Sequence, residues 1–355
     1  MLNDIRIKNF RAFKDFSIAN LAQANLIVGK NNVGKSSLLE AAHLLTGPSN
    51  PDILISLLEK RGEIDYLTDK GGDTGNWSFS LRRGYDIAHL FHGHHLSNNA
   101  HISIHSNEGQ KVTLDYILNS GEPSPKSTSL TSSAALRLQF NSQETFNLEA
   151  VENIIEMQAY TTRRNLASSN SLLISTQGFD FLKLAQFWDL ITLTPKEDSV
   201  VEMLQILDPQ INRISFQSLK GPNSGILIKR SNQDFPIPLG SLGDGIHRVM
   251  AIASALVSAE NGYLFIDEID TGLHYRAIAD LWNLVFKTAA KLNIQVFATT
   301  HSSDCIDSFQ EALDMQKDPS LGRLFRLEKR SNNIVAVEYN NEDLAVATQQ
   351  EIEVR

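Results

Sequence analysis

The stretch ANLIVGKNNVGKSSLLEAAHLL, residues 24–45, decides the fold of this chain. Ala24–Gly29 is an apolar run typical of a buried strand, and from Ser36 to about Leu45 the apolar residues follow helical spacing. Between them, residues 29–36 match the pattern G-x-x-x-x-G-K-[ST]. The stretch therefore predicts a strand, a phosphate-binding loop and a helix.

The residues of this loop suit contact with phosphate. Backbone N–H groups wrap the β- and γ-phosphate oxygens, Lys35 adds a positive charge, and the Ser36 hydroxyl ligates Mg²⁺. The helix N-terminus at Ser36 adds a favourable dipole. Chance would produce the pattern in roughly 1% of chains of this length, but the flanking strand and helix argue against chance. We predict that ATP and Mg²⁺ bind at Gly29, Asn31, Asn32, Gly34, Lys35, Ser36 and Ser37.

Two further strand ends carry catalytic candidates. YLFIDEID, residues 263–270, ends an apolar run in two carboxylates, at the edge of a parallel sheet where ligands bind. There Asp267 would hold Mg²⁺, and Glu268 would orient or deprotonate the attacking water. An ordinary buried strand ending in a charged turn is the alternative. His301, in ATTHSSD after the next apolar strand, is predicted to sense the γ-phosphate; otherwise it is structural or solvated.

Residues 241–245, SLGDG, contain two glycines directly before a predicted apolar helix. Glycine lowers helix propensity, and a simple Ser or Asp cap could start this helix without either glycine. The order of phosphate loop, SLGDG, acidic strand and His301 resembles the ABC-type ATPase head. The branch is that of the structural-maintenance-of-chromosomes (SMC) proteins, RecF and the OLD-family nucleases. Their element before the long helix reads LSGG or similar, and SLGDG is a relaxed variant that keeps Gly243 and has Asp244 next.

The resemblance implies a dimer in which two chains lie head to tail. Ser241, Gly243 and Gly245 of one chain would close over the γ-phosphate held by the other. Asp270, just past the acidic strand, would communicate across the dimer interface. The alternative for SLGDG is a capped buried helix with a flexible entry.

Two weaker positions come from the same resemblance. Arg11, in NFRAF (residues 9–13), would contact phosphate or the partner site; the alternative is a surface arginine on a hairpin. Gln158, in EMQAYTTRR, would contact the metal or water where the sheet joins the helical lobe. Nearby glutamines and Arg163 compete for that role.

The expected fold is α/β, the P-loop NTPase fold of the ABC-ATPase head. It has a mainly parallel central sheet, an N-terminal antiparallel β subdomain and an inserted small helical lobe. We divide the chain into a first ATPase lobe with a β-rich extension (1–150), a helical lobe with returning strands (151–235) and a second ATPase lobe ending in a hairpin (236–355). Helices are expected at 246–259 and 274–291.

The composition restricts the cellular compartment and the kinds of partner that we expect for this protein. Of 355 residues, 42% are hydrophobic, the formal net charge is −9 and there is one cysteine. One cysteine suits a reducing compartment, no secretory segment opens the chain, and the longest apolar run, Val249–Ala259, is too short for a bilayer. We therefore expect a cytoplasmic protein with no membrane contact. The acidic charge does not support nucleic-acid binding, beyond a local basic groove.

The lengths of chain between and after the motifs restrict the functional class. About 80 residues separate Gln158 from Ser241, too few for a long coiled coil, and about 50 follow His301, too few for a Toprim nuclease domain. We therefore expect a stand-alone ATP-hydrolysing head that switches a separate effector, a nuclease or toxin, in anti-phage defence.

Several alternatives stay open. One is a RecF-like DNA-repair ATPase. Another is a small-molecule kinase, in which the arginine pair of TTRR would belong to a mobile lid. The third is an interaction module that binds nucleotide without hydrolysing it, and the presence of Glu268 argues against this one. A GTPase is disfavoured because the guanine-reading N-K-x-D motif is absent.

Six of the ten histidines gather in residues 89–105: His89, His92, His94, His95, His101 and His105. A zinc site, a loop that meets a partner or nucleic acid, and a solvated loop are the three interpretations. Their spacing matches no zinc-ligand pattern and no cysteine is near, so a solvated loop is favoured.

Overall fold

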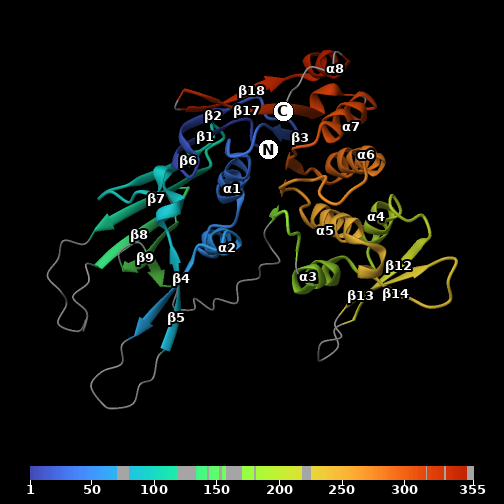
Figure 1. Ribbon diagram of the computed structural model, residues 1–355, viewed down its shortest axis with the longest axis horizontal. Coiled ribbons are helices and arrows are strands. Elements are labelled where there is room, and N and C mark those ends of the chain that lie inside the picture. Colours follow the sequence, from blue (N-terminus) through green and yellow to red (C-terminus); the bar gives the residue numbers. More distant parts are fainter. Residues whose placement is uncertain are drawn as a thin grey trace.

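Two large β-sheets, with helices between and beside them, form most of the molecule (Figure 1). The computed structural model describes residues 1–69, 80–118, 133–141, 144–151, 154–156, 170–179, 181–217, 225–316, 318–331 and 333–349.

The central sheet has six strands within the described residues. In spatial order they are β11 (Ser171–Ile174), β15 (Tyr263–Ile266), β16 (Gln295–Thr299), β3 (Ala24–Val28), β17 (Gly322–Arg330) and β18 (Asn333–Tyr339). The first five are parallel, and β18 returns antiparallel to β17 as the predicted terminal hairpin. Strands from both ends of the chain thus build one sheet, with β3 in its middle.

The second sheet is antiparallel and has nine strands in the described part of the chain. In spatial order they are β2 (Phe13–Ile18), β1 (Ile5–Phe10), β6 (His101–His105), β7 (Lys111–Leu118), β8 (Ser133–Phe140), β9 (Glu144–Val151), β10 (Ile154–Glu156), β5 (Ser80–Asp86) and β4 (Ile64–Asp69). The N-terminal hairpin and the β-rich extension therefore form one continuous sheet.

Helix α1 contacts strands of both sheets, and the other large helices lie beyond the central sheet (Figure 1). A small lobe combines α3, α4 and a sheet of three strands: β12 (Ile211–Gln217), β13 (Gly225–Arg230) and β14 (Ile237–Pro238). The helices are α1 (Lys35–Thr46), α2 (Asp52–Lys60), α3 (Phe181–Ile191), α4 (Pro195–Leu204), α5 (Asp244–Ser258), α6 (Tyr275–Leu292), α7 (Ser303–Asp314) and α8 (Asn341–Gln349). Short 3₁₀ turns are η1 (Ala88–Leu90), η2 (His92–His94), η4 (Leu239–Leu242) and η5 (Pro319–Leu321).

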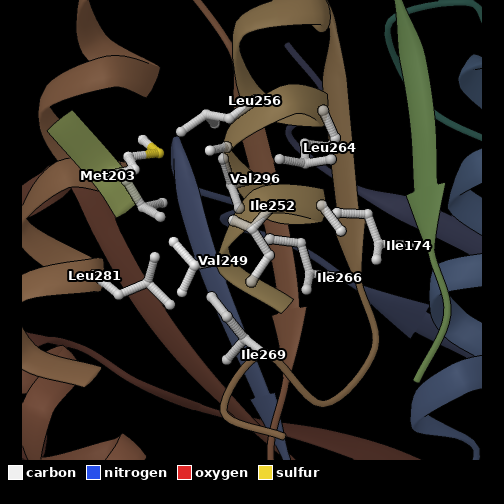
Figure 2. Close-up of a cluster of buried hydrophobic side chains, with 14 of the residues drawn as sticks. Ile174, Met203, Val249, Ile252, Leu256, Leu264, Ile266, Ile269, Leu281 and Val296 are labelled. Carbon is white, nitrogen blue, oxygen red and sulfur yellow. The ribbon is translucent and has the colours of Figure 1, made fainter. Parts of the chain in front are cut away.

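The central strands are apolar throughout because both faces of the sheet are covered. Alternate residues of β15 belong to different hydrophobic clusters: Leu264 and Ile266 face α5 and α6, whereas Phe265 joins the cluster around α1. Figure 2 shows the first cluster, with Ile252 of α5 among the labelled side chains. Continuous rather than alternating hydrophobicity is what a parallel sheet buried on both faces requires.

The predicted division at residue 151 differs from the observed arrangement. β10 still belongs to the antiparallel sheet, and β11 belongs to the central sheet, beside β15. The sequence SLLI of β11 has four residues, buried on both faces, so neither strand alternation nor helical spacing marks it. The small lobe therefore begins after β11, at α3.

Several helix positions also differ from expectation. Helix α5 begins at Asp244, two residues before the predicted start, which places Gly245 in its first turn. Helices α7 and α8 were not predicted. The polar stretch of residues 120–133, which from its sequence we expect to be a solvated hairpin connection, lies almost entirely outside the described residues. No helix of the described residues is both long enough and apolar enough to cross a membrane.

One buried histidine makes the stability of this fold depend on pH. His43 of α1 is buried against Phe265, and its Nδ1 lies 3.0 Å from the Ser171 hydroxyl. Burial, with smaller contributions from Lys60 and Lys183, lowers the pKa of His43 from 6.5 to about 3.

We expect the free energy of unfolding to fall as the pH drops from 6.5 towards 3, because the unfolded chain then binds a proton that the folded chain excludes. The slope from this group approaches about 1.4 kcal/mol per pH unit. Denaturant unfolding of wild type, His43→Gln and a control at exposed His95, His95→Gln, at pH 7.0, 6.0 and 5.5 measures it. The His43→Gln chain should lose less stability than wild type and the control over this range; equal losses would contradict the assignment.

Candidate functional site

The loop between β3 and α1 leaves a row of backbone donors free. Gly34 is the N-cap of α1, at φ 90°, and no side chain caps the helix, so the N–H groups of its first turn are available to an anion. A Cβ at Gly34 would lie 2.9 Å from the Phe13 ring and 3.0 Å from Ala12. Glycine is therefore required here by both backbone conformation and close packing.

Lys35 is held across this loop. Its buried side chain donates from Nζ to the carbonyl oxygens of Gly29, at 2.8 Å, and Lys30, at 2.9 Å. Burial lowers the pKa of Lys35, while the carboxylates of Asp267 and Glu268 act in the opposite direction. A polyanion bound beside Lys35 would add negative charge near its Nζ, and this charge would favour the protonated, ammonium form of the side chain.

The carboxylate of Asp267 links three adjacent strand ends. Its Oδ2 accepts a hydrogen bond from the Ser36 hydroxyl at 2.8 Å, and its Oδ1 accepts one from the Thr299 hydroxyl at 2.7 Å. Ser36 follows β3, Asp267 follows β15 and Thr299 ends β16. The hydroxyl of Ser36 and the carboxylate of Asp267 form a hard-oxygen donor set, which fits Mg²⁺.

Glu268 and His301 lie at the same sheet edge. Glu268 has φ 53°, its N–H donates to the Thr299 hydroxyl at 2.8 Å, and its Oε2 accepts from the Thr271 hydroxyl at 3.1 Å. His301 follows β16 and is exposed. Both side chains are therefore presented to the space over the phosphate loop.

One cavity of about 520 Å³ joins these parts. Its lining is Arg11, Ala12, Asn31, Asn32, Gly34, Lys35, Ser36, Ser37, Arg61, Glu63, His89, His94, Asp267, Glu268 and His301. The structure thus brings together ten of the residues that the sequence assigns to the nucleotide and metal site. Gly29 lies next to these residues, because its carbonyl oxygen accepts a hydrogen bond from Lys35 Nζ.

Arg11 is not a surface arginine. Its guanidinium is buried between two carboxylates, at 2.5 Å from Glu40 and 2.7 Å from Glu63. Arg61, which also pairs with Glu40 at 2.7 Å, lies beside it and is one-third exposed. Arg11 does reach the cavity wall, but its charge is already paired within the chain.

The SLGDG residues lie away from this cavity in the same chain. Ser241 and Gly243 are exposed, and a Cβ at Gly243 would meet no atom within 4 Å. Gly245 instead packs closely, because its Cβ would lie 2.7 Å from the carbonyl oxygen of Gly272. Part of this glycine pattern therefore has a packing cause within one chain. Asp270 accepts a hydrogen bond from the Thr300 hydroxyl at 2.7 Å and also lies outside the cavity lining.

Gln158 lies outside the described residues, as do Arg163 and the TTRR pair. The chain passes from the central sheet to the helical lobe between β11 and α3, and Gln177 is the glutamine of that described segment. It lines a second cavity of about 310 Å³, together with Asp244, Arg248 and Gly272. The role predicted for Gln158 therefore stays a prediction.

Arg248 was missed by the sequence analysis. It is buried on α5, and its guanidinium donates to the carbonyl oxygens of Ser175 at 2.8 Å, Asp267 at 2.5 Å and Glu268 at 2.8 Å. It therefore attaches α5 to the backbone of the acidic pair. An arginine directly before the apolar run Val249–Ala259, in the first turns of the predicted helix, was the available signal.

The histidine-rich segment is also placed by the structure. His89 and His94 line the cavity, whereas His92 binds the carbonyl oxygen of Arg11. No cluster of three or more metal-ligating side chains occurs among the described residues.

Comparisons with known proteins agree with this geometry. Residues 24–307 match the family described as "AAA domain, putative AbiEii toxin, Type IV TA system". A Helicobacter pylori protein named ATP/GTP phosphatase is 24% identical over 377 residues, which cover 97% of each chain. A solved SMC head, bound to the C-winged helix domain of ScpA, has a TM-score of 0.51 and 14% identity, over 96% of this chain and 98% of that one. That likeness confirms the predicted fold class.

The role of Arg248 can be tested through stability. Replacing it in Arg248→Met leaves three carbonyl oxygens without their donor and should cost on the order of 3 kcal/mol in the free energy of unfolding. The control is His247→Met at the exposed neighbouring position. Denaturant unfolding measures both, and hydrogen exchange at residues 267–269 should accelerate only in Arg248→Met. Equal stability of the two variants would show that the contacts contribute nothing.

Proposed function

Because this chain belongs to the AAA domain family described as a putative AbiEii toxin of type IV toxin–antitoxin systems, we propose that it is an ATP-hydrolysing head that dimerises around ATP and switches a separate effector. The chain is an ATPase related to the SMC and OLD-like heads, and the relative named ATP/GTP phosphatase agrees with this activity over 97% of both chains. The finer parts of the proposal are the roles of individual residues, the dimer, the effector and the defence setting.

One observation carries the proposal: Ser36, Asp267, Glu268 and His301, from three adjacent strand ends, face one cavity with the free N–H groups of α1. Lys35 and these N–H groups bind the phosphates, and Ser36 and Asp267 hold Mg²⁺, which supplies charge neutralisation at the β- and γ-oxygens. Glu268 orients the attacking water and accepts its proton. His301 donates a hydrogen bond to the γ-phosphate.

The exposed Ser241 and Gly243 support a dimer. Gly243 has φ 92° and open space around it, so its backbone is accessible to a second molecule. The N-terminus of the 15-residue helix α5, which follows directly, carries positive dipole charge suited to a γ-phosphate on the partner chain. Ser241 does not line the phosphate-loop cavity of its own chain, and in the proposed dimer it completes the site of the second chain.

The family description, which names a putative toxin of a type IV toxin–antitoxin system, supports the defence setting. We propose a separate nuclease or toxin as the effector. We place the protein in the cytoplasm, a reducing compartment that suits its one cysteine, Cys305, which is buried with a free thiol. A pull-down from the native host with and without ATP identifies the effector.

The first test separates binding from turnover. Glu268→Gln keeps the size of the side chain but cannot accept the proton of the attacking water, so ATP hydrolysis should fall at least about 100-fold. With ATP and Mg²⁺ this variant should sediment as a dimer, and the Lys35→Ala, Glu268→Gln double variant should stay monomeric. If Glu268→Gln remains monomeric with ATP and Mg²⁺ at high protein concentration, the shared site is wrong.

The second test asks whether Ser241 acts on the other chain. Lys35→Ala and Ser241→Arg should each abolish hydrolysis alone. When they are mixed, about half of the dimers contain both chains and one intact site, so activity should return to about one quarter of wild type. The ATPase rate of the mixture measures this. An inactive mixture would mean that both groups act within one chain.

A further inference from the structure

The wall of the phosphate-loop cavity on the side of the antiparallel sheet contains two histidine rings. His89 and His94 line the cavity that also contains Lys35 and Ser36. Apart from His301, beside the acidic pair, they are the only ring side chains among the described residues of the lining. Purine bases stack on such rings, and a nucleotide on Lys35 must place its base at some distance from the phosphates.

The segment that carries these rings is fixed to the phosphate loop. The Arg11 N–H donates to the Leu90 carbonyl at 2.8 Å, and His92 Nδ1 lies 3.0 Å from the Arg11 carbonyl oxygen. Leu90 and Phe91 are fully buried between these contacts. The same hairpin presses Ala12 and Phe13 against Gly34, so the histidines and the phosphate loop are held at a set separation.

The two rings are joined to each other. His89 Nδ1 and His94 Nδ1 lie 3.0 Å apart, with the ring centroids 5.0 Å apart and the planes at 64°. A neutral pair in this contact shares one proton, so one ring donates from Nδ1 and keeps its Nε2 unprotonated. The other ring accepts at Nδ1 and carries its proton on Nε2.

Asp86 selects between the two arrangements. Its Oδ2 lies 3.6 Å from His89 Nε2, while its Oδ1 accepts a hydrogen bond from the Ala88 N–H. A carboxylate only accepts, so it favours the proton on His89 Nε2. His94 then donates from Nδ1 to His89, and its Nε2 is left as an acceptor.

We propose that this pair is the base-binding part of the nucleotide site and that it favours adenine. The inference rests on the proposed function, since it needs a triphosphate on Lys35. His94 Nε2 accepts a hydrogen bond from the 6-amino group of adenine at the edge of the base, and the ring of His89, whose plane is tilted by 64° from that of His94, stacks on the face of the base. Guanine presents an oxygen at position 6, which would meet the unprotonated Nε2 of His94. Its binding requires the shared proton to move away from His89 Nε2, so GTP binds more weakly.

Equilibrium titration of the full chain tests this with three probes in Mg²⁺: the non-hydrolysable analogues AMPPNP and GMPPNP, and inorganic triphosphate. Wild type should bind AMPPNP roughly tenfold more tightly than GMPPNP. His94→Phe keeps a ring but loses Nε2, so the two analogues should bind almost equally. His94→Ala should weaken both analogues further. The control is His95→Phe, at an exposed position outside the cavity lining.

Affinity for inorganic triphosphate serves as the internal control, because it should be the same in all four chains if the phosphate loop is intact. If His94→Phe keeps the wild-type preference for AMPPNP, the proposed role of His94 is wrong. If wild type binds inorganic triphosphate as tightly as AMPPNP, no base site exists, although the proposed function survives. If wild type binds none of the three probes, the proposed function fails, and this inference fails with it.

Discussion

The hydrogen bonds of Asp267 to Ser36 and Thr299 are the contacts on which the site depends. They join the ends of β15, β3 and β16, three neighbours in a parallel sheet. Since all three strands end at one edge of the sheet, the carboxylate that follows β15 can reach the hydroxyl at the end of β16 and the hydroxyl that follows β3, which is the next strand beyond β16. This contact holds the phosphate loop beside the acidic pair, and Arg248 supports it from behind through the backbone of the same pair.

Close packing and phosphate binding place overlapping demands on the loops of this protein. Gly34 is needed both for its positive φ and because Phe13 and Ala12 leave no room for a side chain. Gly245 is needed because Gly272 approaches it within one chain, whereas Gly243 has open space around it. The two glycines of this motif therefore differ in their surroundings: packing within the chain accounts for Gly245, and the open space at Gly243 is what the proposed dimer would use.

Paired charges shape the wall opposite the acidic strand. Arg11 and Arg61 meet Glu40 and Glu63 at the edge of the cavity, so the N-terminal hairpin, α1 and the end of α2 are held together by ion pairs. A buried charge is tolerated only when it is paired, which explains why these four residues occur as a set. His89 and His94, which contact each other, line the same cavity beside these ion pairs.

Short local patterns were enough to predict the parallel sheet, the phosphate loop and the acidic strand: an apolar run, glycines at set spacing, and carboxylates at a strand end. The order of these motifs also indicated the ATPase class, which the family match confirms. The three-dimensional arrangement was needed to find that β11 lies beside β15, that Arg11 is buried between carboxylates, and that His89 and His94 share the cavity of Lys35. These features join residues far apart in the chain, and no periodicity within a single segment records which distant side chain will be its neighbour.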